Sequence, residues 1–437
     1  MKQLISLLTL VSIFAFFSCS SDVSVENDET PDTPQTSKPN ILLIIADDMG
    51  LDATPGYSIG SAKPTMPNLE NMIANGLRFN NLWSYPTCTP TRGSILTGKY
   101  GFRTNVMKVD DVMATSEVSL QKHLDNNNSG YSHAVIGKWH LSRDENHPTQ
   151  MGVDYYAGLL SGAAQSYNNW NFTQNGTTST STEYATTKFT DLAIDWVAQQ
   201  NQPWFLWLAY NAPHTPFHFP PTNLHSQGSL PTDEASIDAN PTPYYMAMIE
   251  AMDSEIGRLL NSMSETERDN TIVIFIGDNG TPNQVAQDYR PRRVKGTVYQ
   301  GGVNVPMIIS GKGVSRFNQQ DDNLLNTVDL FATISDIAQI GTKEHYDSNS
   351  FKELLASSTS TNARDFAYTE IGKTTGDDDM TIRNATHKYI RFTDGSEALY
   401  NLNEDFFEVN NLLDATLSNE DQQQLDNLKE TLNNLKN

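Results

Sequence analysis

The segment PNILLIIADD, residues 39–48, decides the fold that the rest of the chain must form. It contains an unbroken aliphatic run, residues 41–46, followed at once by Asp47 and Asp48. A β-branched and aliphatic run without polar alternation is typical of a central strand that is buried on both faces. Three further runs of this kind follow at Ala134–Ile136, Trp204–Ala209 and Thr271–Ile276.

Amphipathic helices are expected between these strands. Two apolar stripes at helical spacing support this, formed by Phe189, Ala193, Trp196 and Val197 and by Ile249, Met252, Ile256 and Leu259. Buried strands that alternate with such helices predict an α/β fold, a three-layer sandwich around a large, mostly parallel central sheet. We expect this main domain to span residues 39–341.

The sequence changes character after about Gly341, and a smaller C-terminal α+β subdomain with an antiparallel sheet is expected over residues 342–437. Its predicted strands are Phe366–Thr369, His387–Phe392 and Ala398–Leu402. A last helix should follow Ser418, which forms a capping box with Asp421. The buried stripe of that helix is Leu425, Leu428, Leu432 and Leu435.

The N-terminus has the pattern of an export signal over residues 1–19. Lys2 precedes an apolar run, residues 4–17, and the Ser18-Cys19 pair that follows is similar to a bacterial lipoprotein signal, in which Cys19 would be lipidated. Plain secretion is the alternative. Residues 20–38 are rich in Ser, Thr, Asp, Glu and Pro, which predicts a disordered acidic linker. We therefore expect an exported protein of the periplasm or cell surface, in contact with the membrane only through a lipid anchor.

The composition limits the partners of the protein. The formal net charge of -23 argues against a nucleic-acid surface, and an anionic substrate would require positive charge concentrated in a pocket. With Cys19 removed or lipidated, Cys88 has no intramolecular partner. A lone cysteine is usually a small core residue, so its neighbours must decide its role.

Each of the four buried runs is followed by residues of a catalytic type. These are Asp47 and Asp48, then Lys138 and His140, then His214, then Asp278 and Asn279. Singly, each has an ordinary reading as a turn, cap or loop residue. In open α/β sheets, however, ligands bind beyond the carboxyl ends of the strands, and four such ends together predict a catalytic site.

The segment PTCTPTRGSILTG, residues 86–98, contains Cys88, Pro90 and Arg92. It resembles the Cys-x-Pro-x-Arg signature of the type I, formylglycine-dependent sulfatases of the alkaline phosphatase superfamily. KGTVYQGG at residues 295–302 and LYNLNEDFFEVNNL at residues 399–412 extend the resemblance over nearly the whole chain after the linker. Thr91 and Asn304 depart from the family, in which Ser and Arg are common at these places.

The resemblance implies a sulfatase whose Cys88 is oxidised to formylglycine by a maturing enzyme. The hydrated aldehyde offers one hydroxyl to attack sulfur and a second to release sulfate. Calcium, with magnesium as the alternative, would be held by Asp47, Asp48, Asp278 and Asn279 next to the modified Cys88. Arg92 would hold the nucleophile, Lys138 and Lys295 would bind sulfate oxygens, His140 would act as the base, and His214 would protonate the departing alcohol and contact the substrate.

Three further expectations concern the surroundings of the site. Cys88 should lie just before a helix that starts near Arg92–Gly93, whose N-terminus would favour an oxyanion. Arg290, Arg292 and Arg293 crowd the approach to Lys295, and either bind substrate, Arg293 in particular, or form a solvated loop. The stretch 161–182 carries Tyr167, Trp170 and Phe172, which either stack on a sugar ring or pack inward.

Export and the acidic composition favour a sulfated polysaccharide or oligosaccharide as substrate. Two alternatives stay open: a formylglycine-dependent phosphonate or phosphate diester hydrolase, and a non-catalytic, surface-displayed carbohydrate-binding protein. A two-zinc phosphatase is disfavoured because the fourth strand ends in Asp278 and Asn279 rather than in Asp-His.

Overall fold

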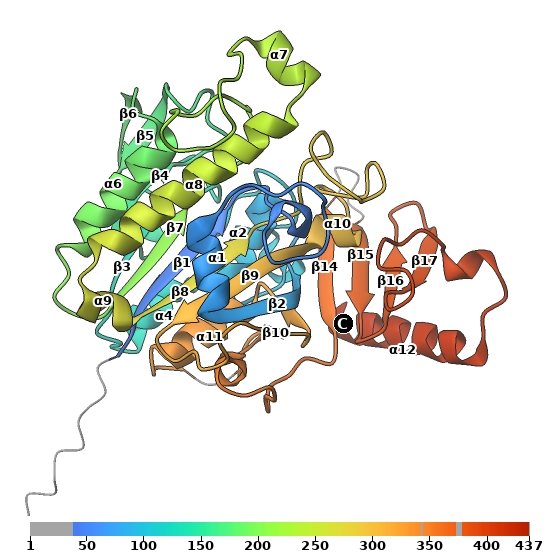
Figure 1. Ribbon diagram of the computed structural model, residues 1–437. Helices are drawn as coiled ribbons and strands as arrows, with labels where there is room; N and C mark the ends of the chain where they lie inside the picture. The colour runs from blue at the N-terminus through green and yellow to red at the C-terminus, as the bar shows by residue number, and fades with distance from the viewer. Residues whose placement is uncertain (1–37, 342–343, 373–377, 437) are drawn as a thin grey trace, which may run out of the picture. The chain divides into compact units, whose positions relative to one another are not determined.

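The computed structural model describes residues 38–341, 344–372 and 378–436, and its main feature is an eleven-stranded sheet (Figure 1). The strand order is β10-β2-β9-β8-β1-β7-β3-β4-β5-β6, and β11 pairs with β2 beside β10. The strands are β1 (Asn40–Ala46), β2 (Gly76–Trp83), β3 (Ser132–Lys138), β4 (Tyr155–Leu159), β5 (Trp170–Gln174), β6 (Thr177–Ser181), β7 (Trp204–Ala209), β8 (Thr271–Gly277), β9 (Asn304–Gly311), β10 (Gln319–Asp321) and β11 (Leu325–Asn326).

The four predicted buried strands are confirmed as β1, β3, β7 and β8. With β4 they form the parallel centre of the sheet, in the order β8-β1-β7-β3-β4. β9 runs antiparallel between β8 and β2, and β5 and β6 form an antiparallel edge. All seven residues of β1 are buried, because helices cover the sheet on both faces.

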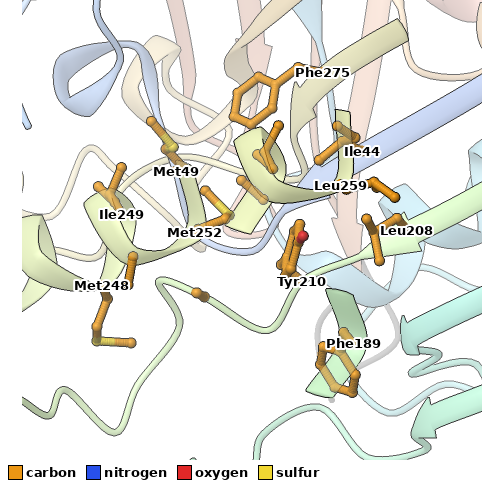
Figure 2. Close-up of a cluster of buried hydrophobic side chains, with 14 of the residues drawn as sticks. Ile44, Met49, Phe189, Leu208, Tyr210, Met248, Ile249, Met252, Leu259 and Phe275 are labelled. Atoms are coloured by element: carbon orange, nitrogen blue, oxygen red, sulfur yellow. The ribbon is translucent and has the colours of Figure 1, made fainter. Parts of the chain in front are cut away.

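Alternate side chains of β1 enter two different cores. Leu42 and Ile44 face a core shared with α1 (Pro67–Ala74), α6 (Ala185–Val197) and α8 (Thr242–Ser262). Figure 2 shows this core, in which Met252 and Leu259 of α8 lie near Ile44 and Leu208. Ile41, Leu43 and Ile45 face the other core, with α2 (Cys88–Thr97), α4 (Leu120–Asn126) and α11 (Asp329–Ile337). The predicted three-layer α/β fold is therefore confirmed.

The connections contain shorter elements. They are η1 (Leu51–Ala53), α3 (Gly101–Thr104), α5 (His147–Gln150), α7 (Glu234–Ala239), α9 (Glu265–Asp269), α10 (Gln300–Val303), β12 (Glu344–His345), β13 (Ser348–Asn349), η2 (Lys352–Leu355) and η3 (Leu412–Asp414).

A separate four-stranded antiparallel sheet lies in the C-terminal region, as predicted. Its strands are β14 (Ala367–Gly372), β15 (Asp378–Arg383), β16 (His387–Arg391) and β17 (Glu397–Asn401), in that order. The closing helix α12 (Asn419–Lys436) buries Leu425, Leu428 and Leu432, and the Ser418 hydroxyl accepts a hydrogen bond from the Asp421 amide at 3.1 Å. The strand β15 was not predicted, because its sequence DDMTIR starts with polar residues.

One expectation about a helix is wrong. The helix α2 begins at Cys88 itself, with Thr87 as its N-cap, and not near Arg92–Gly93. Pro90 is compatible with this earlier start, because it lies in the first turn, where a missing N–H leaves no helical hydrogen bond unmade. Cys88 is therefore part of the helix N-terminus rather than a residue of the preceding loop.

The predicted signal over residues 1–19, with Cys19, and residues 20–37 of the expected linker lie outside the described residues. In the described part of the chain, no helix has both the length and the apolar character needed to cross a bilayer. The boundary at residues 341 and 342 stays a prediction.

Candidate active site

The carboxyl ends of the central parallel strands bring the predicted residues together. Asp47 and Asp48 follow β1, Asp278 and Asn279 follow the neighbouring β8, and Lys138 ends β3. All five are at most 1% exposed. The site therefore lies at the carboxyl ends of the strands, where open α/β sheets bind their ligands. Its five residues are nevertheless buried below the surface of the protein.

Three cation–carboxylate pairs occupy the floor of the site. Arg92 Nη2 donates to Asp278 Oδ2 at 2.8 Å, Lys138 Nζ to Asp47 Oδ2 at 2.5 Å, and Lys295 Nζ to Asp48 Oδ2 at 2.5 Å. Arg92 Nη1 also donates to the carbonyl of Lys138 at 2.7 Å. Three positive and three negative charges thus cancel on this floor.

Burial and neighbouring charges set the protonation of these groups. Burial raises the pKa of Asp47, and Asp278 and Asp48 add to that rise against the opposing effect of Lys138. Burial also opposes ionisation of Asp48, but Lys295 and His214 outweigh it, so the pKa of Asp48 lies below its usual value. The pKa of Lys295 is raised, because Asp48 outweighs the effect of burial.

The oxygen atoms of the site fit a hard divalent cation. Asp47 Oδ1 and Asn279 Oδ1 are buried and have no hydrogen-bond partner among the described residues. Ligand atoms of Asp47, Cys88 and Asp278 lie within 4.8 Å of one another, as do those of Asp47, Asp48 and His214. Buried acceptors without a donor are unfavourable unless a cation satisfies them, and calcium or magnesium prefers such oxygens.

Cys88 lies in the first turn of α2 and is 2% exposed. Its Sγ is 3.2 Å from His140 Nδ1. Burial raises the pKa of this thiol to about 11. An unmodified Cys88 is therefore a neutral thiol near pH 7, which is a weak nucleophile.

The two predicted histidines flank the thiol and the carboxylates. Burial, together with Lys138 and Arg92, lowers the pKa of His140 below its usual value. Burial lowers the pKa of His214 to about 4, and its Nε2 lies 3.7 Å from Asp48 Oδ2. The Nδ1 of His214 lies 2.7 Å from the carbonyl of Thr215, which can only accept, so Nδ1 carries the proton of the neutral ring.

A cavity of about 370 Å³ opens above these groups. Cys88, His140, His214 and Lys295 line it, and two residues that sequence reasoning missed, Asp110 and Arg143, lie on its rim. Asp110 Oδ1 is 3.0 Å from His140 Nε2, and Arg143 Nη2 donates to Asp110 Oδ2 at 3.1 Å. No sequence signal marked Asp110, because it belongs to a polar loop without a motif.

The structure does not bring Arg293 to this cavity. Its guanidinium contacts the carbonyl of Glu408 and stacks 4.3 Å from the ring centre of Tyr299. Arg290 likewise donates to the carbonyl of Val409 at 3.1 Å. The Glu408 carboxylate in turn accepts the Gln300 amide at 2.6 Å. These contacts hold the segment that carries Lys295 against the C-terminal region.

The aromatic residues of the stretch 161–182 follow the inward-packing alternative. Tyr167 and Trp170 are each 1% exposed and belong to the core that β1 shares with α1, α6 and α8. Phe172 packs against that core. The Tyr167 hydroxyl donates to the carbonyls of Asn211 and His214 at 2.5 and 2.7 Å. Tyr167 thus supports the loop of His214 and does not offer a surface for a sugar ring.

Comparison with known families agrees with this geometry. The model of the Sulfatase family matches residues 39–340, and that of the N-sulphoglucosamine sulphohydrolase C-terminal region matches residues 293–437. The chain belongs to the sulfatase family.

Individual relatives are distant in sequence. The sulfatase is 27% identical to the uncharacterized sulfatase YdeN of Escherichia coli over 69% of its own length and 63% of the relative's. It is 26% identical to arylsulfatase J of Mus musculus, covering 70% of the chain and 53% of the relative. A sulfatase of Formosa agariphila is 26% identical, with 89% and 86% covered. The chain thus spans less than two thirds of the length of the first two relatives.

Solved structures share the fold of this sulfatase. Ps i-CgsB in complex with k-i-k-neocarrahexaose superposes with a TM-score of 0.77 and 23% identity, covering 91% of this chain and 93% of that one. A protein in complex with its substrate D-glucosamine-2-N,6-O-disulfate gives a TM-score of 0.74 and 22% identity, with 90% and 97% covered.

Proposed function

We propose that this sulfatase hydrolyses sulfate esters of a sulfated polysaccharide or oligosaccharide. The observation that carries the proposal is the position of Cys88, which lies at the floor of the cavity within 3.2 Å of His140 and beside Asp47 and Asp278. The carbohydrates bound in the two solved structures described above support the substrate class.

Each residue of the site has a task that its position suggests. Lys138 and Lys295 supply ammonium donors for sulfate oxygens, and Arg92 holds Asp278 and the backbone of Lys138 in place. His140 accepts a proton at Nδ1 from the group that replaces the thiol of Cys88. His214 lines the cavity and faces Asp48, and the family resemblance assigns it the return of a proton to the departing alcohol once its Nε2 has taken up a proton. A positioned acid or base contributes about 10²–10⁴ in rate.

Two groups that the family implies complete this proposal. Formylglycine made from Cys88 would supply a hydrated aldehyde, whose hydroxyl is a nucleophile that the neutral thiol of Cys88 is not. Calcium or magnesium held by Asp47, Asp48, Asp278 and Asn279 would supply a Lewis acid that polarises bound oxygen atoms.

Mass spectrometry of the peptide that contains Cys88 tests the modification, using protein made together with a sulfatase-maturing enzyme. We expect formylglycine, turnover of an aryl sulfate, and loss of turnover in Cys88→Ala with an unchanged melting temperature. Cys88→Ser is the matched control, since it offers only one hydroxyl and should not turn over repeatedly. Unmodified Cys88 without turnover would favour a carbohydrate-binding protein.

The reaction class needs a separate comparison. Turnover of aryl sulfate should exceed that of aryl phosphonate and phosphate diesters, and the opposite order would make the protein a phosphoryl hydrolase. Screening a panel of sulfated oligosaccharides then identifies the sugar. We further propose that the protein is exported and held at the periplasmic or outer surface by a lipid on Cys19, which metabolic labelling with a fatty acid would test.

A further inference from the structure

We propose that Asp110 is a positioning residue, which fixes the orientation and the tautomer of His140 so that its Nδ1 faces the nucleophile. The inference rests on the proposed function. Its basis is a line of three side chains: Cys88 Sγ lies 3.2 Å from His140 Nδ1, and His140 Nε2 lies 3.0 Å from Asp110 Oδ1. The Cys88 sulfur marks the place that the hydroxyls of formylglycine would take.

The chemistry of Asp110 determines which ring nitrogen carries the proton. An ionised carboxylate only accepts hydrogen bonds, so His140 Nε2 must donate. A neutral imidazole has a single N–H, and Nδ1 therefore presents its lone pair to Cys88. Thr89 Oγ1 lies 3.2 Å from Nε2 and accepts the Asp110 amide at 3.2 Å, but its hydroxyl can both donate and accept, so Asp110 alone decides the tautomer.

The protein holds both members of this contact in uncommon backbone conformations. The φ angle is 55° at His140 and 65° at Asp110, a left-handed region that residues other than glycine seldom adopt. Such conformations persist where the surrounding structure enforces them, often at functional sites. Arg143 contributes to this by donating to Asp110 Oδ2 at 3.1 Å.

Gly162 also confines the imidazole ring of His140 from one side. A Cβ atom added at Gly162 would lie 2.4 Å from both Cε1 and Nε2 of His140, so only glycine leaves room for the ring. The ring therefore cannot turn freely, and the carboxylate of Asp110 selects between its two tautomers. This is the logic by which a buried aspartate orients the histidine of a hydrolytic triad.

Steady-state kinetics test the proposal in the mature enzyme. Asp110→Asn can donate to Nε2 and so favours the other tautomer; we expect kcat to fall at least about 10²-fold with KM changed less than about threefold. Asp110→Glu should restore part of the rate. Asp111→Asn is the matched control, because Asp111 only accepts the amides of Met107 and Lys108 in the same loop, and its kcat should stay within about threefold of wild type. A kcat for Asp110→Asn within threefold of wild type would overturn the proposal.

Nitrogen-15 NMR of labelled histidine gives a readout that needs no turnover. The protein has nine histidines, and His140→Gln identifies the signals of His140 by their loss. We expect the Nε2–H pattern in wild type and a shift toward Nδ1–H in Asp110→Asn. An Nδ1–H or doubly protonated His140 in wild type would refute the assignment. Matured wild type that hydrolyses no sulfate ester, yet shows the Nε2–H pattern, would refute the proposed function and leave the role of Asp110 in orienting His140 intact.

Discussion

At the scale of single residues, Arg92 is the cation on which the site depends most. It is fully buried and bridges Asp278 and the carbonyl of Lys138, so it connects the ends of β8 and β3. Lysine cannot reproduce this fork, because it carries a single point charge at the end of its chain. Arg92 therefore couples the stability of the fold to the geometry of the site.

Replacing Arg92 by methionine should leave Asp278 buried without its partner. We expect the free energy of unfolding to fall by about 3–5 kcal/mol, measured by urea denaturation followed by circular dichroism. Lys188→Met is the control, because Lys188 forms its ion pair with Glu183, whose side chain is 59% exposed, and its loss should cost less than about 1 kcal/mol. Equal losses in the two variants would contradict this role.

Sequence reasoning found residues that follow strands or belong to a motif, and missed residues that do neither. Asp48 and Lys138 were predictable, because a buried run fixes where its next side chain must lie. Asp110 was not, because the contact with His140 depends on a loop whose path no local pattern determines. The sequence also did not decide whether Tyr167 and Trp170 point inward or outward, because aromatic side chains occur both in hydrophobic cores and on surfaces that bind sugars.

At the scale of elements, close backbone contact positions β3 in the sheet. Gly137 has a φ of 104°, and a Cβ atom there would lie 1.9 Å from the carbonyl oxygen of Ala209 in β7. Lys138 follows directly, and His140 lies two residues beyond it. The spacing of these strands therefore sets the depth at which both side chains enter the site.

Gly137→Ala should push β3 away from β7 and displace Lys138. We expect a loss of more than about 3 kcal/mol in unfolding free energy and of most turnover. Gly130→Ala isolates the backbone strain, because Gly130 also has a positive φ of 75° but nothing lies within 4 Å of an added Cβ. The unfolding free energy of Gly130→Ala should fall by only about 1 kcal/mol. A similar loss in both variants would show that backbone strain alone is responsible.

The parallel centre of the sheet was predictable because its strands are uniformly apolar. The antiparallel strand β2 was not, since its half-buried positions carry residues such as Arg78 and Asn80 that read as surface, and the buried β9 contains Pro306, which argues against a central strand. The start of α2 was misplaced for a related reason, because Pro90 is unfavourable inside a helix but tolerated in its first turn. Long-range pairing, which no single segment encodes, decides such cases.

At the scale of the whole molecule, the net charge of -23 makes anion binding depend on the metal. The floor of the site is neutral, because each of its three cations is paired with a carboxylate. A divalent cation would leave it with two positive charges. Binding of sulfate should therefore follow binding of the cation.

Thermal denaturation tests this order. Sulfate should raise the melting temperature by a few degrees when calcium is present and leave it unchanged after chelation. Chelation should also remove turnover, with calcium or magnesium restoring it. Asn279→Ala, which removes a proposed metal ligand without changing the charge of the floor, should behave as the chelated protein does. Equal stabilisation by sulfate in both conditions would show that the lysines alone attract the anion.

A buried ion pair of the C-terminal region packs against Trp83 of the main sheet and should make stability depend on pH. Lys388 in β16 lies 2.6 Å from Glu408 and 5.0 Å from the ring centre of Trp83 at the end of β2. Burial lowers the pKa of Lys388 to about 8, although Glu408 acts in the opposite direction. Between about pH 8 and the ordinary lysine pKa of about 10.4, the unfolded chain therefore binds more protons than the folded one.

Lys388 should consequently add a rise in unfolding free energy across that window, against the opposing effect of buried tyrosines such as Tyr57 and Tyr100, whose pKa burial raises. Urea denaturation at pH 7.5 and at about pH 10 measures this. Lys388→Met should remove the rise, whereas Lys429→Met, which breaks a half-exposed pair with Glu397, should keep it. An equal pH dependence in wild type and Lys388→Met would show that Lys388 does not contribute to it.

The tie between Glu408 and the segment of Lys295 has a consequence for the order of biosynthesis. Asp47 leaves the ribosome before Glu408, so a growing chain cannot close the wall behind Lys295 until Glu408 has been made. During that interval the thiol of Cys88, which is 2% exposed in the folded protein, would be accessible to the modifying enzyme proposed above. The late tie would thus leave a time window for the proposed maturation.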